Sequence, residues 1–211
     1  MIKFEKDDIN DDLSDKAIEA LNTVLFKKLS IEIEDSSHLH FPTENWQLSQ
    51  FWYNETSSSI LANEIIKNTV WGNKIGIISA PSVYNSLLKK IKIFNLYRIC
   101  YLFEYDKRFS YFPNYIFYDY KEPLKISKEF KDTFDFILVD PPFLSEECLS
   151  NISQTLAYLT SQKIILCTGE IMQHLAFIYA SVLPTNFCPE HENNLANKFL
   201  CYSNYNAKIK L

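Results

Sequence analysis

Glycine is scarce in this sequence, with 3 residues among 211. This excludes the glycine-rich loops that let a backbone approach a phosphate closely. Basic residues are not in excess either, because 21 Lys and Arg are set against 26 Asp and Glu, for a formal net charge of -5 at pH 7. Non-specific nucleic-acid binding needs a basic surface that displaces counterions. The densest basic cluster, Lys89, Lys90 and Lys92, is typical of a solvated helix face.

The cysteines and histidines lack the spacing of a metal or redox site. No two of the five cysteines form a CxxC pair, and the four histidines show no ligand spacing with cysteines or carboxylates. Cys100 and Cys167 lie in apolar runs, where a thiol behaves as a small buried hydrophobe. We therefore expect no metal and no disulfide, as in a reducing, cytoplasmic compartment.

No apolar run is long enough to cross a bilayer. The first residues, MIKFEKDD, are charged and do not resemble a signal peptide. At 211 residues with 47% hydrophobic side chains, the chain predicts one domain with a substantial core. We expect a monomer that does not bind membranes.

The stretch from Phe134 to Phe143, FDFILVDPPF, is the most informative part of the sequence. Its continuous apolar run is typical of a strand buried on both faces of a parallel sheet. Two consecutive prolines cannot continue a strand ladder, so the strand must end at Asp140. Ligands of open α/β sheets bind at this carboxyl end. The simplest alternative is a strand-ending turn with an Asp cap and a buried Phe.

The corner formed by Asp140, Pro141, Pro142 and Phe143 suits an amino nitrogen. Asp140 and the carbonyl groups can accept the hydrogens of the amine, while Phe143 supplies an apolar face. An ionised Asp also favours the ammonium form of a lysine. We therefore expect Asp140 to orient the amine rather than to act as a general base.

Strand-like and helical segments alternate along the chain, which predicts a mostly parallel sheet with right-handed crossovers and helices on both faces. A C-terminal antiparallel hairpin, with strands at Phe187 and at 199–205, would bring the sheet to seven strands. The other predicted strands are 74–80, 97–105, 115–118, 134–140 and 163–168. The predicted helices are 13–29, 56–69, 82–91, 144–158 and 171–183, with a linker over 30–41.

Polar or small residues follow these predicted strands and are candidates for a nucleoside site. Glu104 comes where an acid accepts hydrogen bonds from ribose hydroxyls, although Asp106 competes for this role. Asp119, with Tyr120, could read an adenine amino group, although a simple turn is an alternative. After the first strand, close approach of a ligand would depend on small residues and a helix-starting proline: Ser79, Ala80, Pro81 and Ser82.

Aromatic residues are concentrated in the segment from Asn45 to Tyr53. We predict that Phe51, Trp52 and Tyr53 belong to a lid over a cofactor. The alternative is a loop that only packs over the edge of the sheet.

The sequence resembles the elongation factor 1-alpha lysine methyltransferase 1 family, first described as putative N6-adenine DNA methyltransferases. The tetrapeptide at 140–143 matches the Asp/Asn-Pro-Pro-aromatic motif of S-adenosylmethionine-dependent amino methyltransferases. The resemblance covers nearly the whole chain. It is carried by ENWQLSQFWYNETS (44–57), SAPSVY (79–84), YLFEYDKRF (101–109), YIFYDY (115–120), VDPPFLSEECL (139–149), KIILCTGEIM (163–172) and NLANKFLCYSNY (194–205).

This resemblance implies a Rossmann-like class I methyltransferase fold with S-adenosyl-L-methionine as cofactor. It implies a protein-lysine N-methyltransferase whose protein substrate is translation elongation factor 1-alpha. We expect an N-terminal helix and linker over 1–40 and a methyltransferase domain over 41–211, with 41–57 as the cofactor lid.

Two other functions compete with this interpretation. An N6-adenine methyltransferase acting on DNA or RNA would share the tetrapeptide, with Phe143 stacking on a flipped base. The acidic balance and the missing basic run argue against it. A non-catalytic partner subunit would not need the intact motif. The sequence does not indicate which lysine is modified or how many methyl groups are added.

Overall fold

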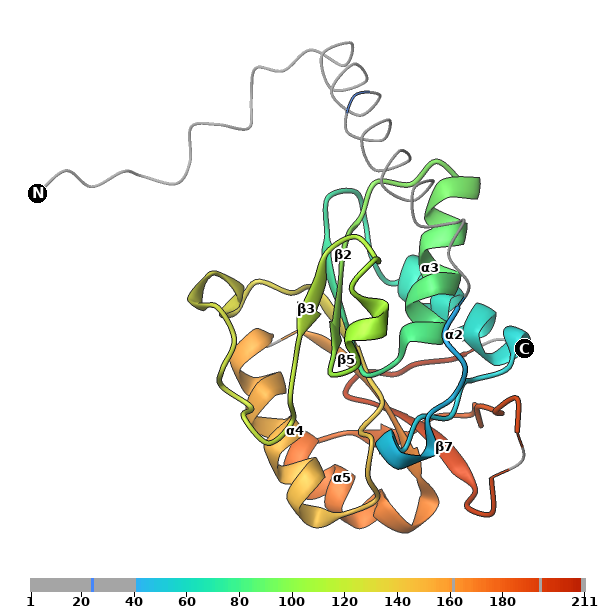
Figure 1. The fold of residues 1–211 in the computed structure, drawn as a ribbon, viewed down its shortest axis with the longest axis vertical. Helices are drawn as coiled ribbons and strands as arrows, with labels where there is room; N and C mark the ends of the chain where they lie inside the picture. The colour runs from blue at the N-terminus through green and yellow to red at the C-terminus, as the bar shows by residue number, and fades with distance from the viewer. Residues whose placement is uncertain (1–23, 25–40, 161, 194, 210–211) are drawn as a thin grey trace, which may run out of the picture.

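The computed structural model describes residue 24 and residues 41–160, 162–193 and 195–209. Within them, one sheet has the strand order β3-β2-β1-β4-β5-β7-β6 (Figure 1). The predicted helix over 13–29 falls outside the described residues except for Val24, and the linker over 30–41 falls outside them except for Phe41.

The sheet is mostly parallel, as predicted. The parallel strands are β1 (Lys74–Ile78), β2 (Ile99–Glu104), β3 (Tyr115–Phe117), β4 (Phe136–Val139) and β5 (Lys163–Gly169). The antiparallel strands are β7 (Phe199–Ser203), which pairs with β5, and β6 (Leu183–Pro184).

Helices cover both faces of the sheet (Figure 1). Helices α2 (Glu55–Lys67) and α3 (Pro81–Ile93) pack on the face that includes Phe136 and Leu138. Helices α4 (Glu146–Leu159) and α5 (Gln173–Ala180) pack on the face that includes Ile137 and Val139. Successive side chains of a strand point to opposite faces, so the apolar run of β4 contributes to both hydrophobic clusters.

The prediction of a strand at Phe187 is wrong. The sixth strand lies at Leu183–Pro184 instead. Leu183 is 61% exposed, so no buried apolar pattern marks it as a strand. Phe187 is instead a buried loop residue whose carbonyl accepts a hydrogen bond from Cys201 N. The helix predicted over 171–183 is also shorter, because α5 ends at Ala180 and Ser181 adopts a left-handed conformation with φ of 53°.

Local sequence accounts for the helix starts. The side chain of Asn54 accepts a hydrogen bond from Ser57 N, and that of Ser145 accepts one from Cys148 N, which caps α2 and α4. Pro81 lies in the first turn of α3, where its missing N–H costs nothing. Short 3₁₀ helices occur at η1 (Trp46–Leu48), η2 (Lys107–Phe109), η3 (Lys128–Phe130) and η4 (Glu170–Met172).

Within the described residues, no helix combines the length and apolar character needed to cross a membrane. Because β1 to β4 are parallel, the residues that follow them meet at one edge of the sheet, where the candidate site lies.

Candidate functional site

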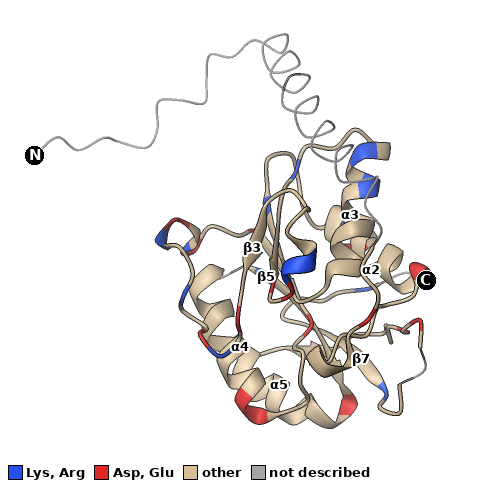
Figure 2. Cartoon of the chain, viewed as in Figure 1, with Lys and Arg blue, Asp and Glu red and all other residues tan. Residues whose placement is uncertain are grey.

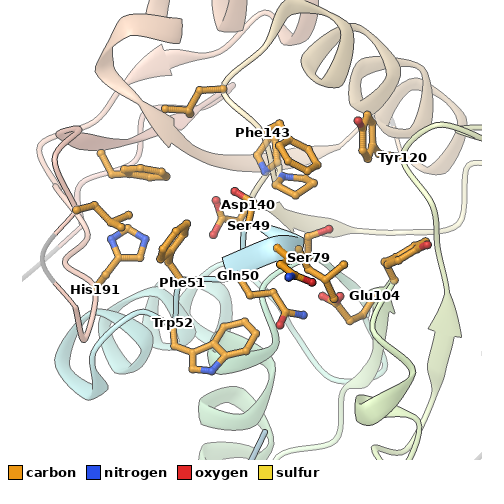
Figure 3. A pocket seen from close by; sticks show the side chains of 18 of the residues that line it. Ser49, Gln50, Phe51, Trp52, Ser79, Glu104, Tyr120, Asp140, Phe143 and His191 are labelled. Carbon is orange, nitrogen blue, oxygen red and sulfur yellow. The ribbon is translucent and has the colours of Figure 1, made fainter. Parts of the chain in front are cut away.

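A cavity of about 390 Å³ lies at the carboxyl ends of the parallel strands. Its volume falls within the range of small-molecule sites, roughly 300–1,000 Å³. Figure 3 shows Asp140 between two groups of side chains, with Phe51 and His191 on one side and Glu104 and Tyr120 on the other. The walls therefore come from segments that are far apart in the sequence.

Asp140 lies at the centre of this cavity. Its backbone N–H donates to Ile78 O at 3.0 Å, which continues the pairing of β4 with β1 and holds the carboxylate at the strand end. Burial raises the pKa of Asp140 to about 8; the nearby Tyr53 hydroxyl opposes this rise and the charge of Glu104 adds to it. Asp140 can therefore exchange a proton near neutral pH.

The rest of the motif forms the cavity wall beside Asp140. Pro141 is buried and Pro142 is partly buried, and both line the cavity with Phe143. Phe143 is 40% exposed, and its ring centroid lies 5.7 Å from that of Tyr120. This exposure does not fit the alternative of a simple turn with a buried Phe.

Glu104 and Asp106 have different surroundings, which bears on their competition for the ribose role. Glu104 is 5% exposed and lines the cavity, with Oε1 accepting a hydrogen bond from Asp106 N at 2.9 Å. Burial raises the pKa of Glu104 to about 7. Asp106 is not on the cavity wall; its carboxylate accepts hydrogen bonds from Gln50 and Arg108. This geometry favours Glu104.

The turn after β1 brings one of its four predicted residues to the cavity. Ser79 lines it, with a left-handed φ of 55°, and its N–H donates to Phe103 O at 2.9 Å. Ser79 thus adopts a conformation that usually requires glycine. Ala80, Pro81 and Ser82 lie behind it at the start of α3 and do not line the cavity.

Asp119 and Tyr120 both line the cavity after β3, as predicted. One carboxylate oxygen of Asp119 accepts a hydrogen bond from Lys121 N at 2.9 Å, which fixes the turn. Their suggested contact with adenine stays a prediction.

The predicted lid segment borders the cavity from Gln47 to Trp52. Gln50 links this segment to the residues that follow β2. Its side chain donates a hydrogen bond to Asp106 at 2.9 Å and accepts one from Arg108 at 3.0 Å. On its other side, Trp52 O accepts a hydrogen bond from Glu192 N at 2.8 Å. The segment is therefore held at two places.

Tyr53 is predicted to contact the cofactor, but its position in the structure does not match that prediction. It is 2% exposed and does not line the cavity. Its buried hydroxyl makes no hydrogen bond of acceptable geometry within the described part of the chain. Burial, with the nearby Asp140 and Cys167, raises its pKa well above the ordinary tyrosine value. Tyr53 instead belongs to the hydrophobic core on one face of the sheet and pairs with His191.

Sequence reasoning missed several lining residues. Most come from the segment before Phe51 and from the stretch between β6 and the start of β7, whereas Tyr105, Lys121 and Leu144 each directly follow a predicted site residue. They include Gln47, Leu48, Ser49, Gln50, Tyr105, Lys121, Leu144, His191, Leu195, Ala196, Asn197 and Phe199. Gln47 to Gln50 lie within the predicted lid over 41–57, and the family resemblance over 194–205 covers Leu195 to Phe199. No group of His, Cys, Asp or Glu that could hold a metal ion is found among the described residues.

The strand order, with an antiparallel β7 inserted between β5 and β6, is that of a Rossmann-like class I methyltransferase fold. A family model described as "Probable N6-adenine methyltransferase" matches residues 44–207. The human protein "EEF1A lysine methyltransferase 1" is 43% identical over 97% of this chain and 96% of its own length. The chain belongs to the EEF1A lysine methyltransferase 1 family.

Two further comparisons bear on the family and on the fold. A Saccharomyces cerevisiae protein named as a protein-lysine N-methyltransferase is 40% identical over 77% of this chain and 72% of its own length. Among solved structures, a branched-chain polyamine synthase from Thermus thermophilus has a TM-score of 0.55 at 10% identity, covering 88% of this chain and 66% of that chain. The second likeness concerns the fold alone.

Proposed function

We propose that this protein is an S-adenosylmethionine-dependent protein-lysine N-methyltransferase whose substrate is translation elongation factor 1-alpha. One observation carries the proposal: the Asp140–Phe143 corner opens on the same cavity as Glu104 and Asp119. An amine-binding corner thus lies beside a nucleoside-binding edge. The names of the relatives from human and yeast support lysine as the target.

The residues present fit S-adenosylmethionine. Glu104 offers a buried carboxylate that can accept hydrogen bonds from both ribose hydroxyls. Asp119 would face the adenine amino group, and the left-handed turn at Ser79 would let the ligand approach the backbone. Phe51 and Trp52 would cover it. When bound, the cofactor supplies a methyl group already activated by its sulfonium charge.

The target lysine must lose its proton before it can attack, and the site favours this in two ways. Burial disfavours the ammonium form of the incoming amine. Asp140, whose pKa is raised to about 8 by burial, holds a proton more readily than an ordinary Asp. Its negative charge therefore opposes amine deprotonation less, and it can orient the amine while accepting its hydrogen. Alignment and proximity then supply most of the rate.

The direct test is to incubate the protein and labelled S-adenosylmethionine in parallel with purified elongation factor 1-alpha, total cellular protein and DNA. Label on a lysine of the elongation factor is the expected result. Label on DNA alone would replace the proposal with the adenine alternative that the name of the family model suggests.

Glu104→Ala should weaken S-adenosylmethionine binding by about 1–3 kcal/mol, because hydrogen bonds to a charged group are lost. Calorimetric titration and the cofactor-induced rise in melting temperature both report it. Glu129→Ala is the matched control, since Glu129 is exposed and away from the cavity. Equal affinity in the two variants would remove Glu104 from the ribose role.

The pH dependence separates a lysine from an adenine target. For lysine, methyl transfer should rise with pH because the incoming amine loses its proton, whose ordinary pKa is about 10.4. Asp140 adds an inflection near 8, because it loses its proton as pH rises through its raised pKa. In Asp140→Asn the inflection should disappear while the rise due to the amine remains. A residual activity of Asp140→Asn that stays flat from neutral to alkaline pH would contradict a lysine substrate.

A further inference from the structure

The cavity has a wall that the cofactor residues do not use, built around His191. The His191 ring lies 4.6 Å from the Tyr53 ring and 4.7 Å from the Phe199 ring, measured between centroids. His191 and Phe199 both line the cavity. In Figure 3, His191 and Phe51 lie on the side of Asp140 opposite Glu104 and Tyr120.

Backbone pairing holds this wall in place. Tyr53 and His191 form an antiparallel bridge. Next to it, Glu192 N donates to Trp52 O at 2.8 Å and Asn54 N donates to Glu190 O at 3.0 Å. The lid segment and the connection before β7 therefore close this side of the cavity as one paired unit.

The wall is apolar and lacks positive charge. Burial lowers the pKa of His191 to about 4, against the opposing effect of the Glu44 carboxylate, so the imidazole is neutral at physiological pH. Leu144 and Leu195 also line the cavity and are aliphatic. Among the described residues that line the cavity, Lys121 is the only Lys or Arg. It directly follows Tyr120, which lies on the opposite side of Asp140 from His191 in Figure 3.

We propose that the wall formed by His191 and Phe199 is the channel through which the side chain of the target lysine reaches Asp140. This inference rests on the proposed function and adds the route of the substrate. The methylene chain of lysine needs an apolar wall, and its cationic end is attracted to aromatic faces but repelled by a positive charge. A neutral imidazole flanked by the Tyr53 and Phe199 rings satisfies both requirements, and Asp140 lies next to this side of the cavity in Figure 3.

The test compares Phe199→Ala, His191→Ala and His191→Phe in the full-length protein, with elongation factor 1-alpha as substrate. The first two should raise KM for the elongation factor by about tenfold, which corresponds to losing the burial of roughly two methylene groups. The cofactor Kd should stay within about twofold of wild type. His191→Phe keeps a neutral ring and should stay within about threefold of wild type in KM.

Phe94→Ala is the control, because Phe94 is 61% exposed and follows α3 at the end away from the cavity. An unchanged KM in both alanine variants would overturn the channel, while active wild-type protein would still uphold the proposed function. A cofactor Kd weakened in parallel with KM would also overturn it, since the wall would then hold the cofactor. If an alanine variant does not fold, Phe199→Leu should raise KM to a smaller extent, and an unchanged KM would count against the channel.

Discussion

Replacing Asp140 with alanine should lower methyl transfer about 10²-fold or more, the scale of losing one positioning group. The strand itself should persist, because its packing comes from Phe136 to Val139, all of which are 0% exposed. Cofactor affinity should change little, since Glu104 and Asp119 are intact. Initial rates with elongation factor 1-alpha and the cofactor Kd, measured on one preparation, separate these effects.

Asp140→Asn separates orientation from proton transfer. An amide oxygen can still accept a hydrogen bond from the amine, but it cannot take up a proton. If Asp140 only orients the substrate, the Asn variant should keep more activity than the Ala variant. A transfer rate that is unchanged in both variants would show that the corner at 140–143 is only a structural turn.

Removing the chain through Tyr53 should abolish cofactor binding, whereas removing the first 40 residues should leave it largely intact. Phe51 and Trp52 line the cavity, and only the longer deletion removes them. Full cofactor binding by the longer truncation would show that the segment only packs against the sheet.

Because Trp52 and Tyr53 also belong to the hydrophobic core, the longer deletion also destabilises the folded protein. A gentler variant, Gln50→Ala, removes the hydrogen bonds to Asp106 and Arg108 and should loosen the segment. We expect its cofactor affinity to fall by about 1 kcal/mol or more.

Tryptophan fluorescence gives an independent measurement of lid closure. The chain has 3 tryptophans, and Trp46 and Trp71 are 71% and 49% exposed. Replacing these two with phenylalanine leaves Trp52 as the reporter. Its emission should change when S-adenosylmethionine binds, and an unchanged spectrum would argue against closure over the ligand.

The amino-acid sequence determined the parallel sheet, because buried strands have a local signature. The run before Asp140 is apolar at every position, and two prolines end it, so both the strand and its end are encoded within ten residues. The same reasoning places Glu104, Asp119 and Asp140 at one edge, since parallel strands end together. The exposed strand at Leu183 has no such signature, and Phe187 was mistaken for it.

Tertiary structure alone decided which of the candidate residues face the cavity. Glu104 and Asp106 are two residues apart and chemically alike, and only the partners of Asp106, Gln50 and Arg108, distinguish them. Tyr53 does not line the cavity and instead pairs with His191, which is distant along the chain. Such contacts join segments that local periodicity and turn chemistry do not connect, so the sequence predicted the cofactor edge, and the fold revealed the opposite wall.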